Sequence, residues 1–132
     1  MILALMALAT VNCGVGQQPT PSPTPGQRVM VEVAAPIDQV DIRVAESNPP
    51  QYSLHVVSGL PNGCVTFDRY EVDRQDDTIM VKVINLEPGD KGVICTEVYG
   101  RVEHNIALGT DFVSGRTYAV LVNDVKKTFV PQ

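Results

Sequence analysis

Residues 78–83 have the sequence Thr-Ile-Met-Val-Lys-Val, in which the apolar residues Ile79, Val81 and Val83 alternate with a methionine and Lys82. A period of two places successive side chains on opposite faces of a β-strand. One face of this segment is therefore expected to be buried, while the face that carries Lys82 meets solvent. We predict a half-buried strand here.

The same period recurs along most of the chain beyond Arg28, and no long stretch keeps a helical spacing. Strands are expected at residues 29–33, 40–44, 52–57, 65–72, 79–83, 93–99, 102–108, 117–123 and 127–130. Clusters of Gly, Pro, Asn and Asp favour turns at residues 48–50, 60–63, 75–77, 87–90 and 123–124. A change of phase between Phe67 and Tyr70 indicates a β-bulge.

Short strands at this spacing predict an all-β fold, an immunoglobulin-like antiparallel β-sandwich of about seven to nine strands. A single sheet of that size would leave one apolar face in water. A small β-barrel is the alternative architecture.

The segment 112–120 favours the sandwich. Phe112 and the turn residue Gly115 precede Tyr118, which begins an alternating strand. This order resembles the tyrosine corner of immunoglobulin-like domains, in which the tyrosine hydroxyl bonds to the upstream backbone. Tyr118 is therefore expected to have a structural role.

Length and charge limit the possible classes of protein. The chain has 132 residues, enough for one domain of roughly 100 residues beyond a leader. Its net charge of -5 lies entirely in the part from Arg28 onward. Nucleic-acid binding needs a basic stripe, which is not seen, so no nucleic-acid partner is expected.

The N-terminal segment has the features of an export signal. Residues 1–13 begin with an uncharged apolar run that is too short to span a bilayer. They end in a lipobox-like sequence at Cys13, which predicts lipidation of this cysteine and a lipid anchor in the membrane. Asn12 is atypical for a lipobox, so plain secretion stays an alternative. Both alternatives predict an exported protein of the cell envelope.

Residues 14–27 form a Pro/Thr-rich linker, in which alternating prolines exclude a helix and favour an extended spacer. The folded domain is then residues 28–132. Within it, Cys64 and Cys95 form an even pair, which predicts a disulfide in an exported protein. Two buried free thiols are the alternative.

The sequence has no recognisable catalytic or metal-binding pattern. His55 and His104 are expected on the surface, and neither has a nucleophile or a carboxylate at a recognisable spacing. No zinc, calcium or nucleotide motif is recognisable, so no cofactor and no metal are expected. Carboxylate pairs of the kind that hydrolases use are set by the fold rather than by sequence spacing.

Two loops have compositions that suit contact with a ligand. Leu60, Pro61 and Asn62 lie in a stiff Gly/Pro/Asn loop next to Cys64, which suits the presenting loop of a protease inhibitor at residues 59–64. The second loop carries Tyr99, Arg101 and His104. Ordinary turns between strands have the same composition.

The chain also resembles a group of short exported bacterial proteins of uncharacterised function. The resemblance is carried by five segments of sequence: residues 59–64, 67–74, 95–100, 105–112 and 118–123. It implies export, a sandwich fold and pairing of Cys64 with Cys95, and it brings no activity.

These observations together predict a surface-tethered or secreted binding module without catalytic activity, whose ligand is a protein or a small molecule. A secreted protease inhibitor and a structural cell-envelope protein are the alternatives.

Overall fold

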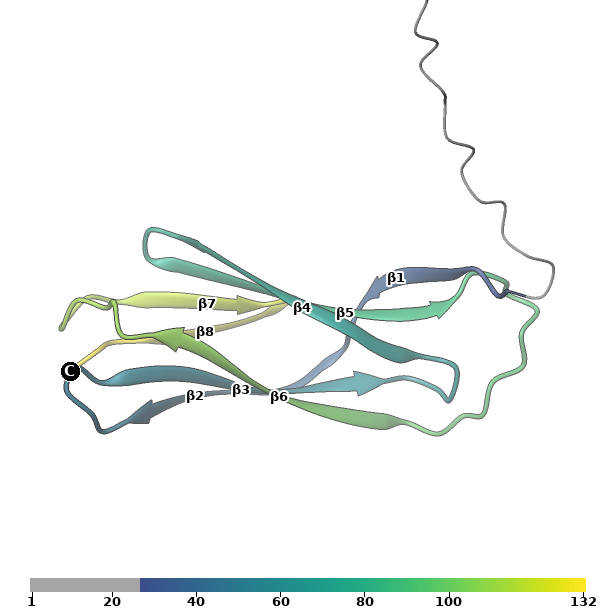
Figure 1. Ribbon diagram of the computed structural model, residues 1–132, viewed down its shortest axis with the longest axis horizontal. Coiled ribbons are helices and arrows are strands. Elements are labelled where there is room, and N and C mark those ends of the chain that lie inside the picture. Colours follow the sequence, from purple (N-terminus) through teal and green to yellow (C-terminus); the bar gives the residue numbers. More distant parts are fainter. Residues whose placement is uncertain (1–26) are drawn as a thin grey trace, which may run out of the picture.

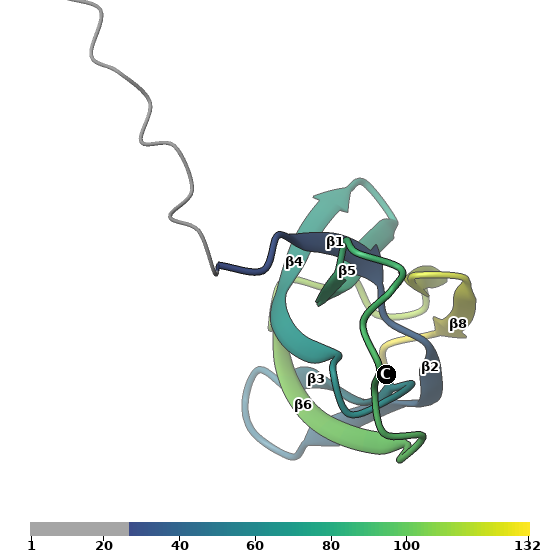
Figure 2. The same ribbon diagram turned by 90° about the vertical axis from the view of Figure 1, so that its right-hand side faces the viewer.

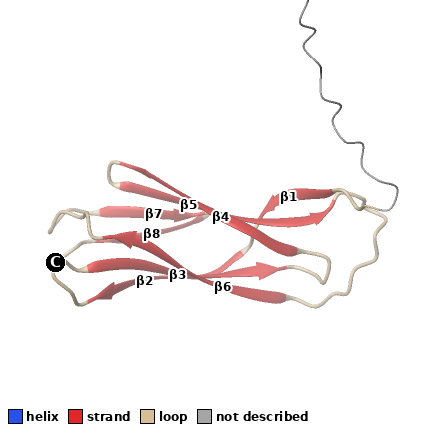
Figure 3. Cartoon of the chain, viewed as in Figure 1, coloured by secondary structure: helices blue, strands red, loops and turns tan. Residues whose placement is uncertain are grey.

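The computed structural model describes residues 27–132, so the lipobox at Cys13 and nearly all of the linker lie outside the described residues. The described chain is built from β-strands and loops (Figures 1 and 3). Its strands are β1 (Met30–Ala34), β2 (Ile37–Ala45), β3 (Gln51–Leu60), β4 (Thr66–Gln75), β5 (Thr78–Pro88), β6 (Gly100–Gly109), β7 (Tyr118–Val122) and β8 (Val125–Phe129).

The strands form two packed sheets. One sheet has the order β2-β3-β6. In the other, β5 pairs with β4 on one side and with β1 and β7 on the other, and β8 follows β7. Figure 2 shows the two layers end-on. The predicted β-sandwich is thereby confirmed, and the alternative of a closed barrel is wrong.

The core lies where the alternating sequence predicts it. Ile79, Val81 and Val83 of β5 are buried, while Lys82 is exposed. They belong to one apolar cluster with side chains from the other sheet, such as Leu54 of β3. The predicted bulge is also confirmed, since the register of β4 against β5 shifts between Phe67 and Arg69.

One strand pair departs from the antiparallel prediction. β7 runs parallel to β5, with Thr78 opposite Ala119 and Val81 opposite Val122. β7 enters this sheet from β6 of the other sheet and takes the half of the β5 edge that β1 leaves free. β1 pairs with the other half, from Ile84 to Pro88.

A side chain bridges the gap between β1 and β7. Asn123, just after β7, accepts a hydrogen bond from Val83 N at 2.9 Å. Its amide nitrogen donates to the carbonyl oxygens of Val83 and Ala35, at 3.0 and 2.7 Å. The amide therefore satisfies Val83 N of β5 and the carbonyl of Ala35, directly after β1, and it shares the Val83 carbonyl with Ala35 N.

The prediction of a strand at residues 93–99 is wrong. This segment is a loop between β5 and β6, free of turns and bends. Its backbone bonds run from Gly63 N to Thr96 O, at 2.8 Å, and from Val93 N to Asp90 O, at 3.4 Å, so among the described residues it is joined to the turns after β3 and β5 and not to a sheet. We call residues 93–99 the display loop.

Candidate functional site

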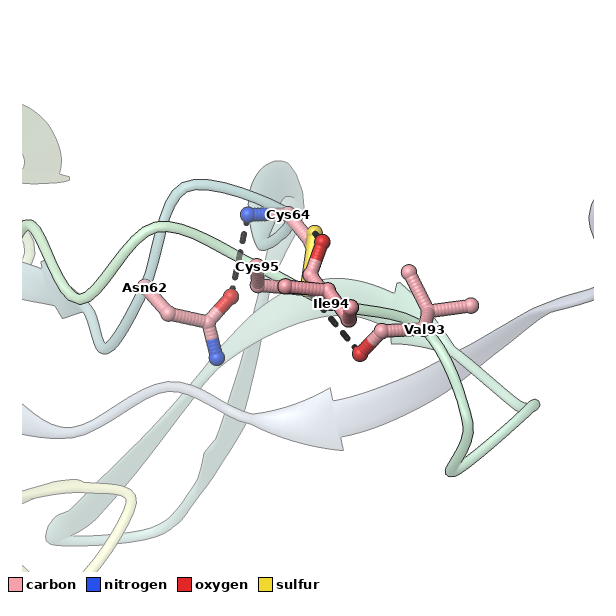
Figure 4. Close-up of a disulfide and its surroundings, with 5 residues drawn as sticks. All are labelled: Asn62, Cys64, Val93, Ile94 and Cys95. Carbon is pink, nitrogen blue, oxygen red and sulfur yellow. Dashed lines mark hydrogen bonds between the residues drawn. A yellow bond between two sulfur atoms is a disulfide. The ribbon is translucent and has the colours of Figure 1, made fainter.

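A disulfide joins the β3–β4 turn to the β5–β6 loop at one end of the sandwich. Cys64, in the turn after β3, is bonded to Cys95 of the display loop, and their Cα atoms are 5.5 Å apart (Figure 4). The predicted disulfide is confirmed, and the alternative of two free thiols is wrong. The Sγ atom of Cys64 also lies 4.0 Å from the carbonyl oxygen of Ile94. The display loop is thus fixed to the body of the domain at its centre.

The turn on the other side of the disulfide is shaped to fit the display loop. A Cβ atom built on Gly63 would lie 2.0 Å from Thr96 Oγ1, so a glycine permits the close approach that the Gly63–Thr96 hydrogen bond needs. The side chain of Asn62 turns back and accepts a hydrogen bond from Cys64 N at 2.9 Å. These contacts stiffen both of the loops that the disulfide links.

The first predicted contact loop, residues 60–62, is mostly packed against the domain. Leu60 ends β3, pairs with Gly100 of β6 and is half-buried. Asn62 is half-buried, with its amide engaged as described above. Pro61 is the member of this predicted set that is exposed. The most exposed apolar side chains near the disulfide lie instead on its other side, in the display loop.

Two residues of the second predicted contact loop converge on an acidic side chain. The Tyr99 hydroxyl donates to Asp38 Oδ1 at 2.8 Å, and Arg101 Nε donates to Asp38 Oδ2 at 3.1 Å. The Arg101 guanidinium carbon is 5.7 Å from the centre of the Tyr99 ring. The hydrogen bond to the Asp38 carboxylate raises the pKa of Tyr99 above its ordinary value. Sequence spacing could not reveal Asp38, since it lies 61 residues before Tyr99.

The third residue of that loop, His104, is not on the surface as expected. Only 6% of it is exposed, its Nε2 lies 2.8 Å from Ser58 Oγ, and its ring centre is 4.5 Å from that of Phe67. Burial lowers the pKa of His104. Ser58 is fully buried, so this serine–histidine pair has no access to a substrate.

The expectation of a surface position is also wrong for His55, which is 8% exposed. Its Nδ1 lies 3.2 Å from Asn105 Oδ1, and Glu103 is 4.0 Å from its Nε2. The physical reason is the position of β3 at the centre of a three-stranded sheet. Side chains of β2 and β6, such as Asp41 and Asn105 opposite His55, cover the outer face of the strand.

Tyr118 has the geometry of a tyrosine corner. Its hydroxyl accepts a hydrogen bond from Val113 N at 2.9 Å, and the residue is almost completely buried. The Phe112 ring packs edge-on against the Tyr118 ring with centres 4.9 Å apart. The Arg74 guanidinium lies over Phe112, 4.5 Å from its centre. This aromatic cluster supports the end of the sandwich opposite the disulfide.

The densest charged cluster of the described chain is internally paired. Arg69 of β4 reaches across β5 to Glu32 of β1, with Nη1 2.7 Å and Nη2 3.2 Å from the two carboxylate oxygens. It also binds Glu71 at 2.9 Å and contacts Asp68. The hydrogen bonds and the charge of Arg69 lower the pKa of Glu32. Because its charges are already matched, this cluster is a weak candidate for binding an ion or a partner.

The display loop has the most exposed apolar side chains near the disulfide. Ile94, directly before the bonded Cys95, is 97% exposed. Val98 is 68% exposed and Tyr99 46%. Figure 2 looks onto this end of the sandwich, where the loop crosses from one sheet to the other. A hollow of about 460 Å³ lies beside the loop and is lined by Gln27, Arg28, Val29, Pro88, Asp90 and Val93.

The sequence pattern predicts a strand over the display loop and therefore does not predict the loop's exposure. The signal against a strand was present, since Val93 is followed by Ile94 and Val98 by Tyr99. Adjacent apolar pairs place one apolar side chain on each face, which breaks the period of two.

Other kinds of site were considered within residues 27–132. No three or more His, Cys, Asp and Glu side chains gather there in a group that could hold a metal ion. The same residues contain no helix that could cross a bilayer. The candidate lipidation site, Cys13, is not among the described residues.

Comparison with known proteins identifies two similarities. The sequence profile of the ORF11 beta-sandwich domain matches residues 54–130. A protein of Herpetosiphon aurantiacus, described as an uncharacterized 10.2 kDa protein in the HgiCIIM 5′ region, is 32% identical over 89 residues. That match covers 67% of this chain and 92% of the relative. No solved structure matches the chain. The profile match includes both cysteines of the disulfide, the display loop and Tyr118.

Proposed function

The chain belongs to the ORF11 β-sandwich domain family, and on this premise we propose that it is a non-catalytic binding module that contacts a protein partner through the display loop. The observation that carries the proposal is Ile94, which is 97% exposed although the disulfide fixes the residue next to it. A folded protein gains nothing in stability from such a side chain, whereas an interface gains from burying it.

The energetics of the loop favour binding. Burying a large aliphatic side chain contributes roughly 1.5 to 3 kcal/mol to an association. A flexible loop would lose part of this gain through the entropy of ordering. Here the disulfide, the Gly63–Thr96 hydrogen bond and the Tyr99–Asp38 hydrogen bond order the loop before any partner arrives.

The exposed surface supports a protein as the ligand. Ile94, Val98 and Tyr99 protrude, and the hollow beside them is open and contains both Arg28 and Asp90. Small-molecule sites are usually concave and enclosed, while protein interfaces combine aliphatic and aromatic contacts with a polar rim.

The proposed setting is the cell envelope or the surrounding medium. The disulfide supports an oxidising compartment, because such bonds are rare in the cytosol. The proposal includes lipidation of Cys13, with residues 14–27 as the spacer between the anchor and the domain. The partner would then be another envelope protein or a protein that arrives from outside.

The experiment compares capture of partners by two matched variants. Ile94→Ser with Val98→Ser changes the display loop, whereas Val44→Ser with Val130→Ser changes two exposed valines that line a groove at the opposite end. The immobilised proteins are exposed to an envelope extract and the bound proteins are identified by mass spectrometry. We expect the loop variant to lose a partner that the wild type and the groove variant retain. A partner that all three proteins retain would contradict the proposal.

A further inference from the structure

Besides the isolated Ile94, the display loop has one run of consecutive exposed residues. Thr96, Glu97, Val98 and Tyr99 are exposed in succession, whereas Val93 and Cys95 are half-buried. The segment contains no turn or bend, and none of these residues has a positive φ. A segment without turns whose consecutive side chains lie in solvent is accessible to an endoprotease, which binds its peptide substrate in an extended form.

The segment is anchored on both sides of the Glu97–Val98 peptide bond. On the N-terminal side, Cys95 is bonded to Cys64, and Thr96 O accepts the hydrogen bond from Gly63 N. On the C-terminal side, the Tyr99 hydroxyl is bonded to Asp38. Glu97 and Val98 are suspended between these two anchors.

The main chain between the anchors is available to a partner. Within the described residues, the backbone N–H groups of residues 94–98 make no hydrogen bond to another backbone group. A protease binds its substrate by pairing with such an extended backbone, as in the addition of a β-strand.

We propose that residues 96–99 are a substrate-like loop that inhibits an endoprotease whose primary pocket accepts a glutamate side chain. This inference rests on the proposed function and names the class of its partner. Glu97 occupies the primary pocket, because it precedes the peptide bond that the anchors flank. The presenting loop is then at residues 96–99, on the other side of the Cys64–Cys95 disulfide from residues 59–64, where the sequence predicts it.

The anchors explain how such a loop would inhibit the protease. Hydrolysis of the Glu97–Val98 bond adds one water molecule and leaves a carboxylate on Glu97 and an amino group on Val98. Cys95 and Tyr99 hold the two new ends in place, so the Val98 amine stays close to the Glu97 carboxyl group. The protease then catalyses the reverse reaction, in which the amine re-forms the peptide bond and the water molecule is released. Slow net cleavage with tight binding is the result.

The experiment uses the full chain against three purified serine endoproteases, specific for glutamate, for basic residues and for small aliphatic residues. We expect inhibition of the glutamate-specific enzyme alone, with the loop intact by mass spectrometry. Glu97→Gln should weaken inhibition about 100-fold, since it removes a charge that the pocket pairs. The control Glu46→Gln changes an exposed glutamate near the opposite end and should leave the inhibition constant unchanged.

A second variant tests the anchors. Cys64→Ser with Cys95→Ser should convert the inhibitor into a substrate that is cut between Glu97 and Val98. No inhibition by the wild type, rapid cleavage of its loop, or equal inhibition by Glu97→Gln would each overturn the inference. If this inference fails while the Ile94 and Val98 variant still loses a captured partner, the proposed function stands and only the class of partner is wrong.

Discussion

The hydroxyl of Tyr99 lies where the side chain of any other residue at position 59 would begin, since a Cβ atom built on Gly59 would be 1.8 Å from it. Gly59 thus makes room on β3 for the ring that anchors one side of the display loop. The colliding atoms are the far end of a partly exposed side chain, so Gly59→Ala should displace the ring at little cost, about 1 kcal/mol or less.

The displacement is measurable through the pKa of Tyr99. In the wild type the hydrogen bond to Asp38 raises this pKa above 10.0. Gly59→Ala should bring it back towards that value, as measured by absorbance titration of the tyrosinate against a Tyr99→Phe reference. Asp38→Asn is the matched control, because it removes the charged acceptor without moving the ring. A pKa unchanged by Gly59→Ala would show that the ring stays in place.

His104 should make the domain less stable in acid. Burial lowers its pKa in the folded state below the ordinary 6.5, so below that pH the unfolded chain binds more protons than the folded one. The contribution of His104 to the free energy of unfolding is therefore complete above pH 6.5. It decreases as the pH falls towards the pKa of His104 in the folded state. Urea unfolding across this pH range should show that the free energy of unfolding of the wild type falls in acid, and that the fall is smaller in His104→Gln. An equally steep loss in His104→Gln would exclude His104 as its cause.

Loss of the disulfide should lower the free energy of unfolding by about 3 to 4 kcal/mol, because it releases a constraint on the unfolded chain. The bond spans a separation of 31 residues. Urea unfolding of the Cys64→Ser and Cys95→Ser double variant measures the effect, and the reduced wild type is its control. The intact wild type should also be two hydrogen atoms lighter than the reduced form. A mass equal to that of the reduced form would contradict the bond.

Asn123→Ala should lower the free energy of unfolding by about 2 to 3 kcal/mol, because it leaves Val83 N of β5 and the carbonyl of Ala35 without their side-chain partner. Asn123 also has a positive φ of 49°, which a glycine adopts without strain. Asn123→Gly therefore separates the two effects, since it removes the amide and relieves the backbone. If thermal unfolding shows the alanine variant, which gains no relief of the backbone, to be as stable as the wild type, the bridging amide contributes nothing.

Cys13→Ser should release the protein from membranes, because lipidation needs the cysteine thiol. Cell fractionation followed by immunoblotting measures the release, and Cys13→Ser is compared with the double variant of Cys64 and Cys95, which keeps the anchor. Retention of Cys13→Ser in the membrane fraction would refute the lipid anchor.

The fold could be predicted where the signal is local. The alternation at Ile79, Val81 and Val83, the phase slip after Phe67 and the pairing of two cysteines each depend on a few neighbouring residues or on simple counting. Each of these predictions agrees with the structure.

The other features of the fold and of the candidate site depend on which strands become neighbours. The sequence pattern does not contain this information. His55 is buried because β3 lies between β2 and β6. Asn123 lies in the turn that the sequence predicts, and its pattern does not show that the amide bonds to Ala35, which lies 88 positions away. The display loop resembled a strand in composition, and its partners, Gly63 and Asp38, come from elsewhere in the chain.

The chain enters β1 at the end of the sandwich that carries the display loop, since Arg28 and Val93 line the same hollow. Its last residue, Gln132, lies at the other end (Figure 1). The N-terminal end of the described domain and the display loop thus share one end of the sandwich, and the C-terminus lies at the other. For the same reason, a fluorophore or an affinity tag is best placed after Gln132, where it cannot shield the loop from an approaching protein.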